Sequence, residues 1–245
     1  MTLILLTQAS LVLLFPLSLS KVLLCFLVYG GGTVLTLYLL FYPRSQWLVG
    51  NRSQVRCTDK ACFALTFDDG PSGHHTLRLL EILRDNGVKA TFFVIGKRAE
   101  AEPELLRQIC EEGHTIANHT YSHPPLFCFL TPRQLRAEIE QGQETISRIC
   151  GVKPEYFRSP VGLRHPLLEL YLRRADLEFV SWRVRAFDTI VQNPEVLRNR
   201  ILKRIGPGDI VMLHDKGGPA GNVMLDVLPG LLNELKDRGF ECVPV

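Results

Sequence analysis

The chain has 245 residues, enough for one domain with a substantial hydrophobic core or for two small ones. Its 28 basic and 25 acidic residues nearly balance. No strong basic field therefore points to a nucleic-acid partner, and no acidic run points to a solvating tail. Net charge gives no further indication of function, so the prediction depends on the order of apolar and polar segments along the chain.

The first 43 residues differ in composition from the rest. Lys21 is the only charged residue among them, and it separates two apolar runs, 2–20 and 22–42. Each run is about the 20 residues that a helix needs to cross a bilayer, and neither shows the polar stripe of a core helix. A cleaved signal peptide fits poorly, because no basic segment precedes the first run. We expect residues 1–43 to anchor the chain in a membrane.

The arrangement of this anchor stays open. Two transmembrane helices that turn near residues 18–21 are preferred, and one long span with an interfacial leader is the alternative. Four basic residues follow the second run and favour a cytoplasmic domain by the positive-inside tendency. They are Arg44, Arg52, Arg56 and Lys60.

Residues 44–60 are polar and predict a linker, after which short apolar runs alternate with helical patterns. Strands are expected at 62–67, 88–95, 114–118, 156–159, 177–184, 209–213 and 240–245. Helices are expected at 77–86, 103–112, 131–150, 166–174, 194–205 and within 223–238, the last interrupted at Pro229. The clearest helix has Thr131 as its N-cap, Pro132 first and Gln134 third, which is a capping-box pattern. This alternation predicts a parallel sheet, and its number of units suits a barrel, whose active groups gather at the carboxyl ends of the strands.

Polar residues suited to catalysis follow several of these strands. Asp68 and Asp69 end the first strand, where adjacent side chains point in different directions, so one can bind a metal while the other faces a substrate. A plain turn is the alternative, because Asp, Gly and Pro all favour turns. His119 and His123 follow the third strand. Their i, i+4 spacing suits two ligands of one ion, or else one is buried and the other lies on the surface.

Three further strand ends carry charged side chains. Arg158 either orients a carboxylate through paired hydrogen bonds or lies on the surface before a turn. Asp188 follows the next strand and is uninformative alone. His214, followed by Asp215, ends an apolar strand and is well placed for acid–base work. One carboxylate and two histidines make a three-ligand site with open positions, the count typical of a catalytic metal, and leave a carboxylate and a histidine as base and acid.

This ordered set of motifs resembles the polysaccharide deacetylase family. The matching segments are 66–71, 119–123, 158–162, 182–188 and 213–214. The resemblance covers residues 61–245, so we expect an anchor at 1–43, a linker at 44–60 and a catalytic domain at 61–245. It implies an α/β fold of the distorted, incomplete (β/α) barrel type. It also implies a hydrolase that removes N-acetyl groups from amino sugars in a polysaccharide or glycan, with a divalent metal, zinc first among the candidates.

The resemblance also implies a role for each strand-end residue. Asp69, His119 and His123 would hold the metal. Water activated by that metal would attack the amide, with Asp68 as the general base and His214 as the general acid.

Further residues would position these groups or contact substrate. Arg158 would position the base, and Asp188 would orient the acid. Four residues would shape the substrate pocket: Pro160, Val161, Trp182 and Leu213. The chain departs from the family pattern twice. Val161 stands where the third motif has tyrosine, although its backbone N–H remains to stabilise an oxyanion, and Thr189 stands where the fourth has tryptophan, which changes one wall of the sugar groove.

Alternatives remain for the substrate and the compartment. The same residues suit a deacylase of a lipid-linked sugar at the membrane, or hydrolysis of another C–N or acyl bond. A non-catalytic glycan-binding module is disfavoured, because acid, base and ligands are all present. The family's usual glycan substrates favour an extracytoplasmic domain, against the four basic residues. Of the seven cysteines, Cys57 and Cys62 could pair in an oxidising compartment, but isolated buried thiols are preferred.

Overall fold

The computed structural model describes residues 19–42, 47–58 and 60–245, and the chain divides after Tyr42 into two compact units. In the first unit, helix α2 spans Leu19–Phe41. Its stretch Val22–Leu40 has a mean hydropathy of 2.0 and is long and apolar enough to cross a membrane. Most of the first apolar run lies outside the described residues. The turn expected at 18–21 is not seen where the chain is described, because α2 is already helical from Leu19.

The second unit is built around a curled parallel sheet of eight strands. They are β1 (Cys62–Asp68), β2 (Thr91–Val94), β3 (Thr115–Asn118), β4 (Tyr156–Phe157), β5 (Glu178–Phe179), β6 (Val184–Arg185), β7 (Asp209–His214) and β8 (Glu241–Val243). Their order is β5-β4-β3-β2-β1-β7-β6, with β8 paired to β1, and each of these neighbouring strands runs parallel to its partner. Strands β5 and β6 are the two edges of the sheet and do not pair with each other, so the sheet forms the incomplete barrel expected from the sequence.

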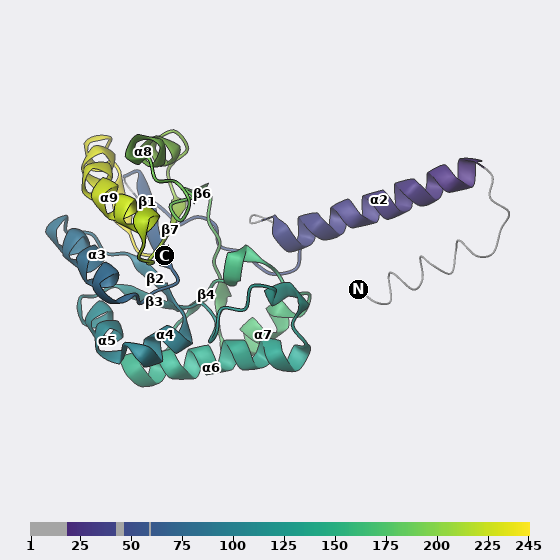
Figure 1. Ribbon diagram of the computed structural model, residues 1–245, viewed down its shortest axis with the longest axis horizontal. Coiled ribbons are helices and arrows are strands. Elements are labelled where there is room, and N and C mark those ends of the chain that lie inside the picture. Colours follow the sequence, from purple (N-terminus) through teal and green to yellow (C-terminus); the bar gives the residue numbers. More distant parts are fainter. Residues whose placement is uncertain (1–18, 43–46, 59) are drawn as a thin grey trace. The chain divides into compact units, whose positions relative to one another are not determined.

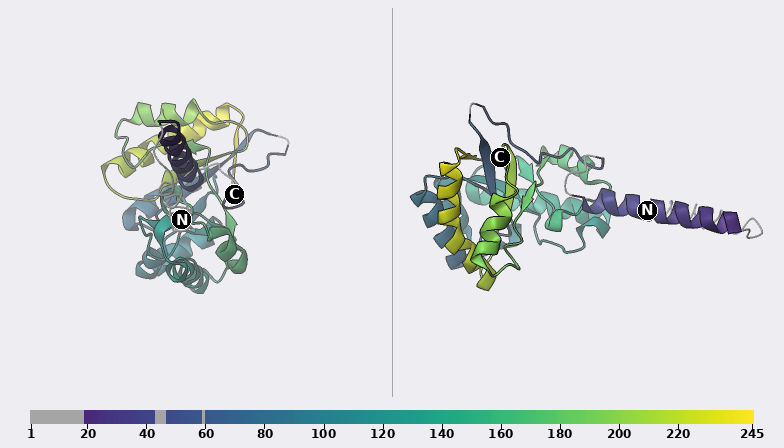
Figure 2. Two further views of the ribbon diagram at one scale, coloured as in Figure 1. Left: turned by 90° about the vertical axis from the view of Figure 1, so that its right-hand side faces the viewer. Right: turned by 90° about the horizontal axis from the view of Figure 1, so that it is seen from above.

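Helices cover the outside of this sheet (Figure 1). They are α3 (Gly73–Asp85), α4 (Gly96–Ala101), α5 (Pro103–Glu111), α6 (Pro132–Cys150), α7 (Leu168–Ala175), α8 (Pro194–Leu202) and α9 (Pro219–Asp237). Short 3-10 turns lie at Phe127–Phe129 and Pro160–Gly162. The second view of Figure 2 shows α8 and α9 on one side of the strands.

Period-two alternation divides the buried strand residues between two faces. Phe63, Leu65 and Phe67 of β1 pack into the large core beneath the helices. Ala64, between them, joins a smaller cluster on the inner face together with Phe93 and Trp182. Thr66 and Asp68 continue this inner row, because alternate strand residues share a face. The strand therefore delivers Asp68 to the inner side at its carboxyl end.

The segment 177–184, expected as one strand, is not a single strand. The apolar run 177–184 forms two separate strands, β5 and β6, which lie at opposite edges of the sheet. Residues between them cross the opening, and Val180 there bridges Arg52. Arg52 N donates to Phe179 O, and Ser181 N donates to Arg52 O. The expected linker is thus partly an ordered segment that lies against the open side of the barrel.

Other boundaries follow local chemistry. Helix α6 has the predicted capping box between Thr131 and Gln134, and Gly151 ends it with a φ of 71°. Helix α9 is not interrupted at Pro229 but continues to Asp237. Buried leucines on both sides of the proline, including Leu228 and Leu231, hold the helix against the core, which offsets the one lost backbone hydrogen bond.

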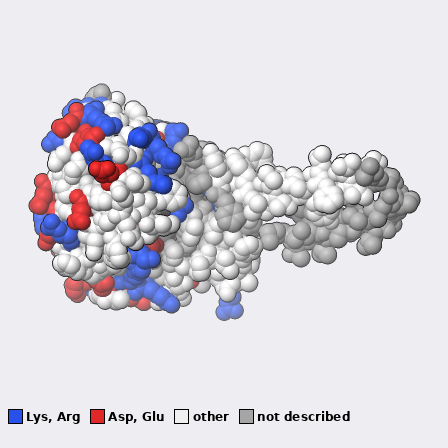
Figure 3. Space-filling model, turned by 45° about the horizontal axis from the view of Figure 1, so that its top comes forward, with Lys and Arg blue, Asp and Glu red and all other residues white. Residues whose placement is uncertain are grey.

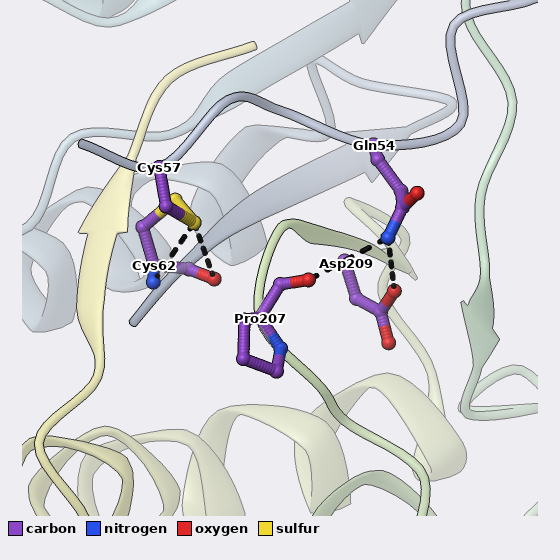
Figure 4. Close-up of a disulfide and its surroundings, with 5 residues drawn as sticks. All are labelled: Gln54, Cys57, Cys62, Pro207 and Asp209. Atoms are coloured by element: carbon purple, nitrogen blue, oxygen red, sulfur yellow. Dashed lines mark hydrogen bonds between the residues drawn. A yellow bond between two sulfur atoms is a disulfide. The ribbon is translucent and has the colours of Figure 1, made fainter. Parts of the chain in front are cut away.

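Two cysteine pairs form disulfides. Cys57 pairs with Cys62, where the chain enters β1 (Figure 4), and Cys110 pairs with Cys150. The preferred expectation of isolated thiols is therefore wrong for these four residues. The sequence pattern did not indicate the second pair, because its members lie on different helices, 40 residues apart.

Candidate active site

The carboxyl ends of the strands bring the expected residues together at one edge of the sheet. Asp68 ends β1 and His214 ends β7, and the two residues are direct partners in the register of these parallel strands. His119 follows β3, and Arg158 follows β4. Residues separated by up to 146 positions in the chain thus meet because parallel strands end at a common edge.

Asp69, His119 and His123 form one cluster of potential metal ligands. Their ligand atoms all lie within 4.8 Å of one another. The Asp69 Oδ1 atom is 3.6 Å from His119 Nε2 and 3.3 Å from His123 Nε2. Two ligands on one tetrahedral zinc ion, at about 2.0–2.1 Å each, stand about 3.3–3.5 Å apart. Both separations from Asp69 are close to this value, so the residues present fit a divalent metal ion of this kind.

Protonation also favours metal binding by this cluster. His119 Nδ1 is 2.7 Å from the Arg158 carbonyl oxygen, which can only accept, so Nδ1 carries the hydrogen and Nε2 keeps its lone pair. Burial lowers the pKa of His123, and the charge of His119 lowers it further, which favours a neutral ligand. Burial alone would raise the pKa of Asp69, but the hydrogen bond and charges of the surrounding histidines lower it overall, so this carboxylate is ionised.

The loop between the two histidines is braced by helix α6. Glu138 of that helix accepts hydrogen bonds from Tyr121 N at 3.1 Å, Ser122 N at 2.8 Å and Ser122 Oγ at 2.6 Å. His123 has a φ of 57°, a conformation that residues other than glycine rarely adopt without support. Glu138 thus holds the loop that carries His123. This role could not be predicted from the sequence, because Glu138 is one of several acidic residues on a helix.

Asp68 is buried and is held by Arg158. The Arg158 Nη1 atom donates to Asp68 Oδ1 at 2.6 Å and lies 2.9 Å from Thr66 Oγ1. The guanidinium carbon lies 3.9 Å from the Phe93 ring centroid, so an aromatic face and a carboxylate both stabilise this fully buried cation. Burial lowers the pKa of Arg158, and the Asp68 carboxylate opposes that effect. Arg158 is therefore a buried positioning cation and not a surface arginine.

His214 and Asp188 form a second pair, in which the aspartate is buried and the imidazole is partly exposed. Asp188 Oδ1 is 3.0 Å from His214 Nδ1, and its Oδ2 accepts from His214 N at 2.7 Å. This arrangement fixes the ring and leaves Nε2 for other partners. Burial alone would lower the pKa of His214, but the hydrogen bond and charge of Asp188, together with Asp68 and Asp69, raise it overall. A raised pKa keeps the imidazole protonated at higher pH.

The expected pocket residues divide into two groups. Pro160 and Val161 lie in a 3-10 turn directly after Arg158, and Val161 has a φ of 57°. Trp182 lies on the inner face. Leu213 packs into the core beneath the helices, and its contact with substrate stays a prediction. Met212, the neighbour of Leu213 on β7, belongs to the same inner-face cluster as Trp182.

Two other buried polar residues are structural. Asp215 is fully buried, and its carboxylate lies 3.0 Å from His75 Nδ1 and 2.6 Å from the donating Thr76 hydroxyl. Its backbone N–H donates to Asp68 O, so it ties α3 to the ends of β1 and β7. His114 accepts from Ala90 N, and burial lowers its pKa to about 4. A neutral, buried His114 that accepts a backbone hydrogen bond has a structural role.

Comparison with known proteins gives this arrangement a family. A model of the polysaccharide deacetylase family matches residues 55–180. A peptidoglycan-N-acetylglucosamine deacetylase of Bacillus cereus is 35% identical over 188 residues, which cover 76% of this chain and 67% of that protein. The chain belongs to the polysaccharide deacetylase family. A second member, a chitooligosaccharide deacetylase of Azorhizobium caulinodans, is 34% identical over 74% of this chain and 91% of its own length.

Solved structures of polysaccharide deacetylases share the fold. A crystal structure of a peptidoglycan N-acetylglucosamine deacetylase has a TM-score of 0.74 at 32% identity, and the match covers 80% of this chain and 90% of that one. A family 4 carbohydrate esterase from Streptomyces lividans, in complex with acetate, has a TM-score of 0.68 at 33% identity. The match covers 75% of this chain and 92% of that one. A Bacillus anthracis protein described as a pseudoenzyme has the same fold, with a TM-score of 0.70 at 24% identity over 76% of this chain and 64% of that one. The fold alone therefore does not establish catalysis in this polysaccharide deacetylase.

Proposed function

We propose that this chain is a metal-dependent hydrolase that removes N-acetyl groups from amino sugars of peptidoglycan or a related glycan. The observation that carries the proposal is the triad of Asp69, His119 and His123 beside a buried carboxylate and a histidine paired with a buried aspartate. Three protein ligands leave positions for water and substrate, which separates a catalytic metal site from a structural one. The names of the relatives supply the substrate class.

The triad of Asp69, His119 and His123 would hold the metal, with zinc the best match to two imidazoles and one carboxylate. A divalent ion bound there lowers the pKa of water toward about 7 and polarises the amide carbonyl. The hydrogen bond from His119 Nδ1 to the Arg158 carbonyl orients this ligand, and Glu138 orients the loop of the other histidine.

Asp68 is proposed as the general base. Its Oδ1 is occupied by Arg158 at 2.6 Å, which leaves the other oxygen to take a proton from the attacking water. Asp69 has a φ of 75°, so the backbone turns between the two carboxylates and lets each meet a different partner. Adjacent residues can thereby serve as base and ligand.

His214 is proposed as the general acid. Its raised pKa keeps a proton available for the departing amine, which is a very poor leaving group without one. Asp188 holds Nδ1, so Nε2 is the atom that would deliver the proton. Val161 N–H would stabilise the developing oxyanion, because the next two N–H groups of its turn are used by Ser159 O and Pro160 O.

We place the catalytic unit outside the cytoplasm, anchored by α2. The Cys57–Cys62 and Cys110–Cys150 disulfides support this side, because disulfides persist in oxidising compartments. They outweigh the basic residues after the helix, which are few. On the face seen in Figure 3, basic and acidic residues are interspersed.

Protease added to intact spheroplasts should digest the catalytic unit, and complete protection until the membrane is lysed would place the unit in the cytoplasm.

Acetate release tests the proposed reaction. Full-length protein in detergent or nanodiscs is incubated with N-acetylglucosamine oligomers and with peptidoglycan, and acetate is quantified enzymatically. Release by the native chain that His214→Ala and Asp68→Asn both abolish would support the assignment. Absence of release from every glycan by a chain that binds zinc would overturn the proposed acyl group or substrate.

A further inference from the structure

The segment that follows α2 is fixed to the catalytic unit beside helix α7. Val49 is buried, and Gly50 N donates to Glu169 Oε2 at 3.0 Å. Helix α2 ends at Phe41, eight residues before Val49. Eight residues of extended chain span at most about 30 Å. The chain therefore limits the distance between Phe41 and Val49 to about 30 Å.

Exposed apolar side chains concentrate on two segments of this part. Leu126 and Phe129, in the loop after the metal-binding histidines, are 64% and 57% exposed. Leu167 and Leu170, at the start of α7, are also exposed. We call these four residues the apolar ridge. Large apolar side chains grouped on a surface mark an interaction site more often than single ones do.

A buried histidine joins the two segments of the apolar ridge. His165 Nε2 is 3.0 Å from Leu130 O, which can only accept, and its Nδ1 accepts from Leu167 N at 3.0 Å. Both ring nitrogens are thus used between the loop and the helix. Burial lowers the pKa of His165, which favours the neutral ring that this pattern requires. The ridge is therefore one fixed surface rather than two independent loops.

We propose that the apolar ridge contacts the surface of the bilayer that holds α2. This inference rests on the proposed membrane anchor and adds a second contact to it. The short connection keeps the ridge near the membrane, and Trp47, which is 81% exposed, lies within that connection. Tryptophan favours the interface between lipid and water, and shallow insertion of leucine and phenylalanine removes apolar surface from water. Arg133 and Arg174 are exposed nearby along the chain and suit anionic headgroups.

The contact would set the position of the active site. His123, a proposed metal ligand, lies three residues before Leu126. A ridge seated on the bilayer would hold the metal cluster close to the membrane surface. The substrate class that follows is a glycan next to the membrane, rather than one in distant layers of the wall.

Photo-crosslinking in nanodiscs tests this contact with the full chain. The probe p-benzoylphenylalanine replaces one residue at a time: Phe129 in the ridge, Val152 as the matched control, and Leu27 in α2. Val152 is an apolar residue of similar exposure, 55%, and it follows α6 at the amino edge of the sheet. Lipid adducts are counted by mass spectrometry after irradiation. We expect at least about ten-fold more adduct at Phe129 than at Val152, the ratio expected if one buried apolar side chain stabilises the contact.

The three positions separate the two proposals. Adducts at Leu27 and Phe129 but not at Val152 would support both the anchor and the ridge. Adducts at Leu27, with Phe129 no higher than Val152, would overturn the ridge and leave the anchor intact. No adduct at Leu27 would overturn the anchor and the ridge with it, whereas acetate release would still report on the catalytic proposal.

Discussion

Asp68 and Asp69 illustrate how one backbone angle separates two neighbouring carboxylates. Asp68 continues the inner row of β1 and meets Arg158, whereas Asp69, at a φ of 75°, turns toward His119 and His123. A carboxylate held by an arginine and a carboxylate held among histidines have different tasks. Substitutions at the two positions should therefore fail in different ways.

Asp68→Asn should keep the fold and the bound metal but lose turnover by about 10²–10⁴-fold, because an amide retains a hydrogen bond with Arg158 yet cannot accept the proton. The measurements are kcat for acetate release and zinc content by mass spectrometry. Asp226→Asn, at an exposed position on α9, is the control and should be unchanged. Near-normal turnover of Asp68→Asn would remove this residue from the role of base.

Asp188→Asn should shift the pH dependence of kcat/KM. The Asp188 carboxylate helps to raise the pKa of His214 against the effect of burial, so its loss lowers that pKa. A general acid is active only while protonated, and the alkaline limb of the profile should therefore move to lower pH. A limb that stays in place while kcat falls would show that the pair does not titrate as the acid.

At the scale of elements, helix α6 supports the metal site from outside it. Glu138→Ala should weaken zinc affinity by about 10–100-fold, because three hydrogen bonds to the loop between the histidines are lost. Glu140→Ala on the same helix removes a carboxylate that binds Arg136 and should leave affinity unchanged. Competition with a chromogenic chelator measures both. Equal affinity in the two variants would contradict the bracing role of Glu138.

The sequence predicted elements well where local chemistry decides them. Thr131 and Gln134 mark the start of α6 by capping alone, and Asp68 and His214 follow apolar strands whose parallel pairing brings them together. The run 177–184 looked like one strand because its composition is apolar throughout. Only the tertiary structure shows that it divides between the two edges of the sheet.

Substrate-facing and supporting residues were harder to predict. The family resemblance implied that Leu213 shapes the pocket, and that role stays a prediction: Leu213 packs beneath the helices, whereas its neighbour Met212 belongs to the inner-face cluster. Period-two alternation indicates from the sequence which of two neighbouring strand residues faces inward. Glu138 could not have been found in the same way, because its partners lie 16 and 17 residues earlier and become neighbours only when α6 packs beside the loop.

The whole molecule combines an apolar helix, disulfides and a catalytic unit, which fits an enzyme on the outer side of a membrane. Alkylation of the unfolded native chain should modify three thiols, those of Cys25, Cys128 and Cys242, and the four paired cysteines should react only after reduction. Intact mass spectrometry counts the modified groups in protein isolated from its native membrane. Seven reactive thiols without reductant would contradict the oxidising compartment.

The most direct test of the central claim is metal-dependent acetate release by the full-length protein. Activity on N-acetylglucosamine oligomers is measured for the native chain, after treatment with a chelator, and after zinc is restored. The account predicts release that the chelator abolishes and zinc restores, with no recovery in His119→Ala, whose ligand is missing. Release that persists after the metal is removed would contradict a reaction that depends on the cluster of Asp69, His119 and His123.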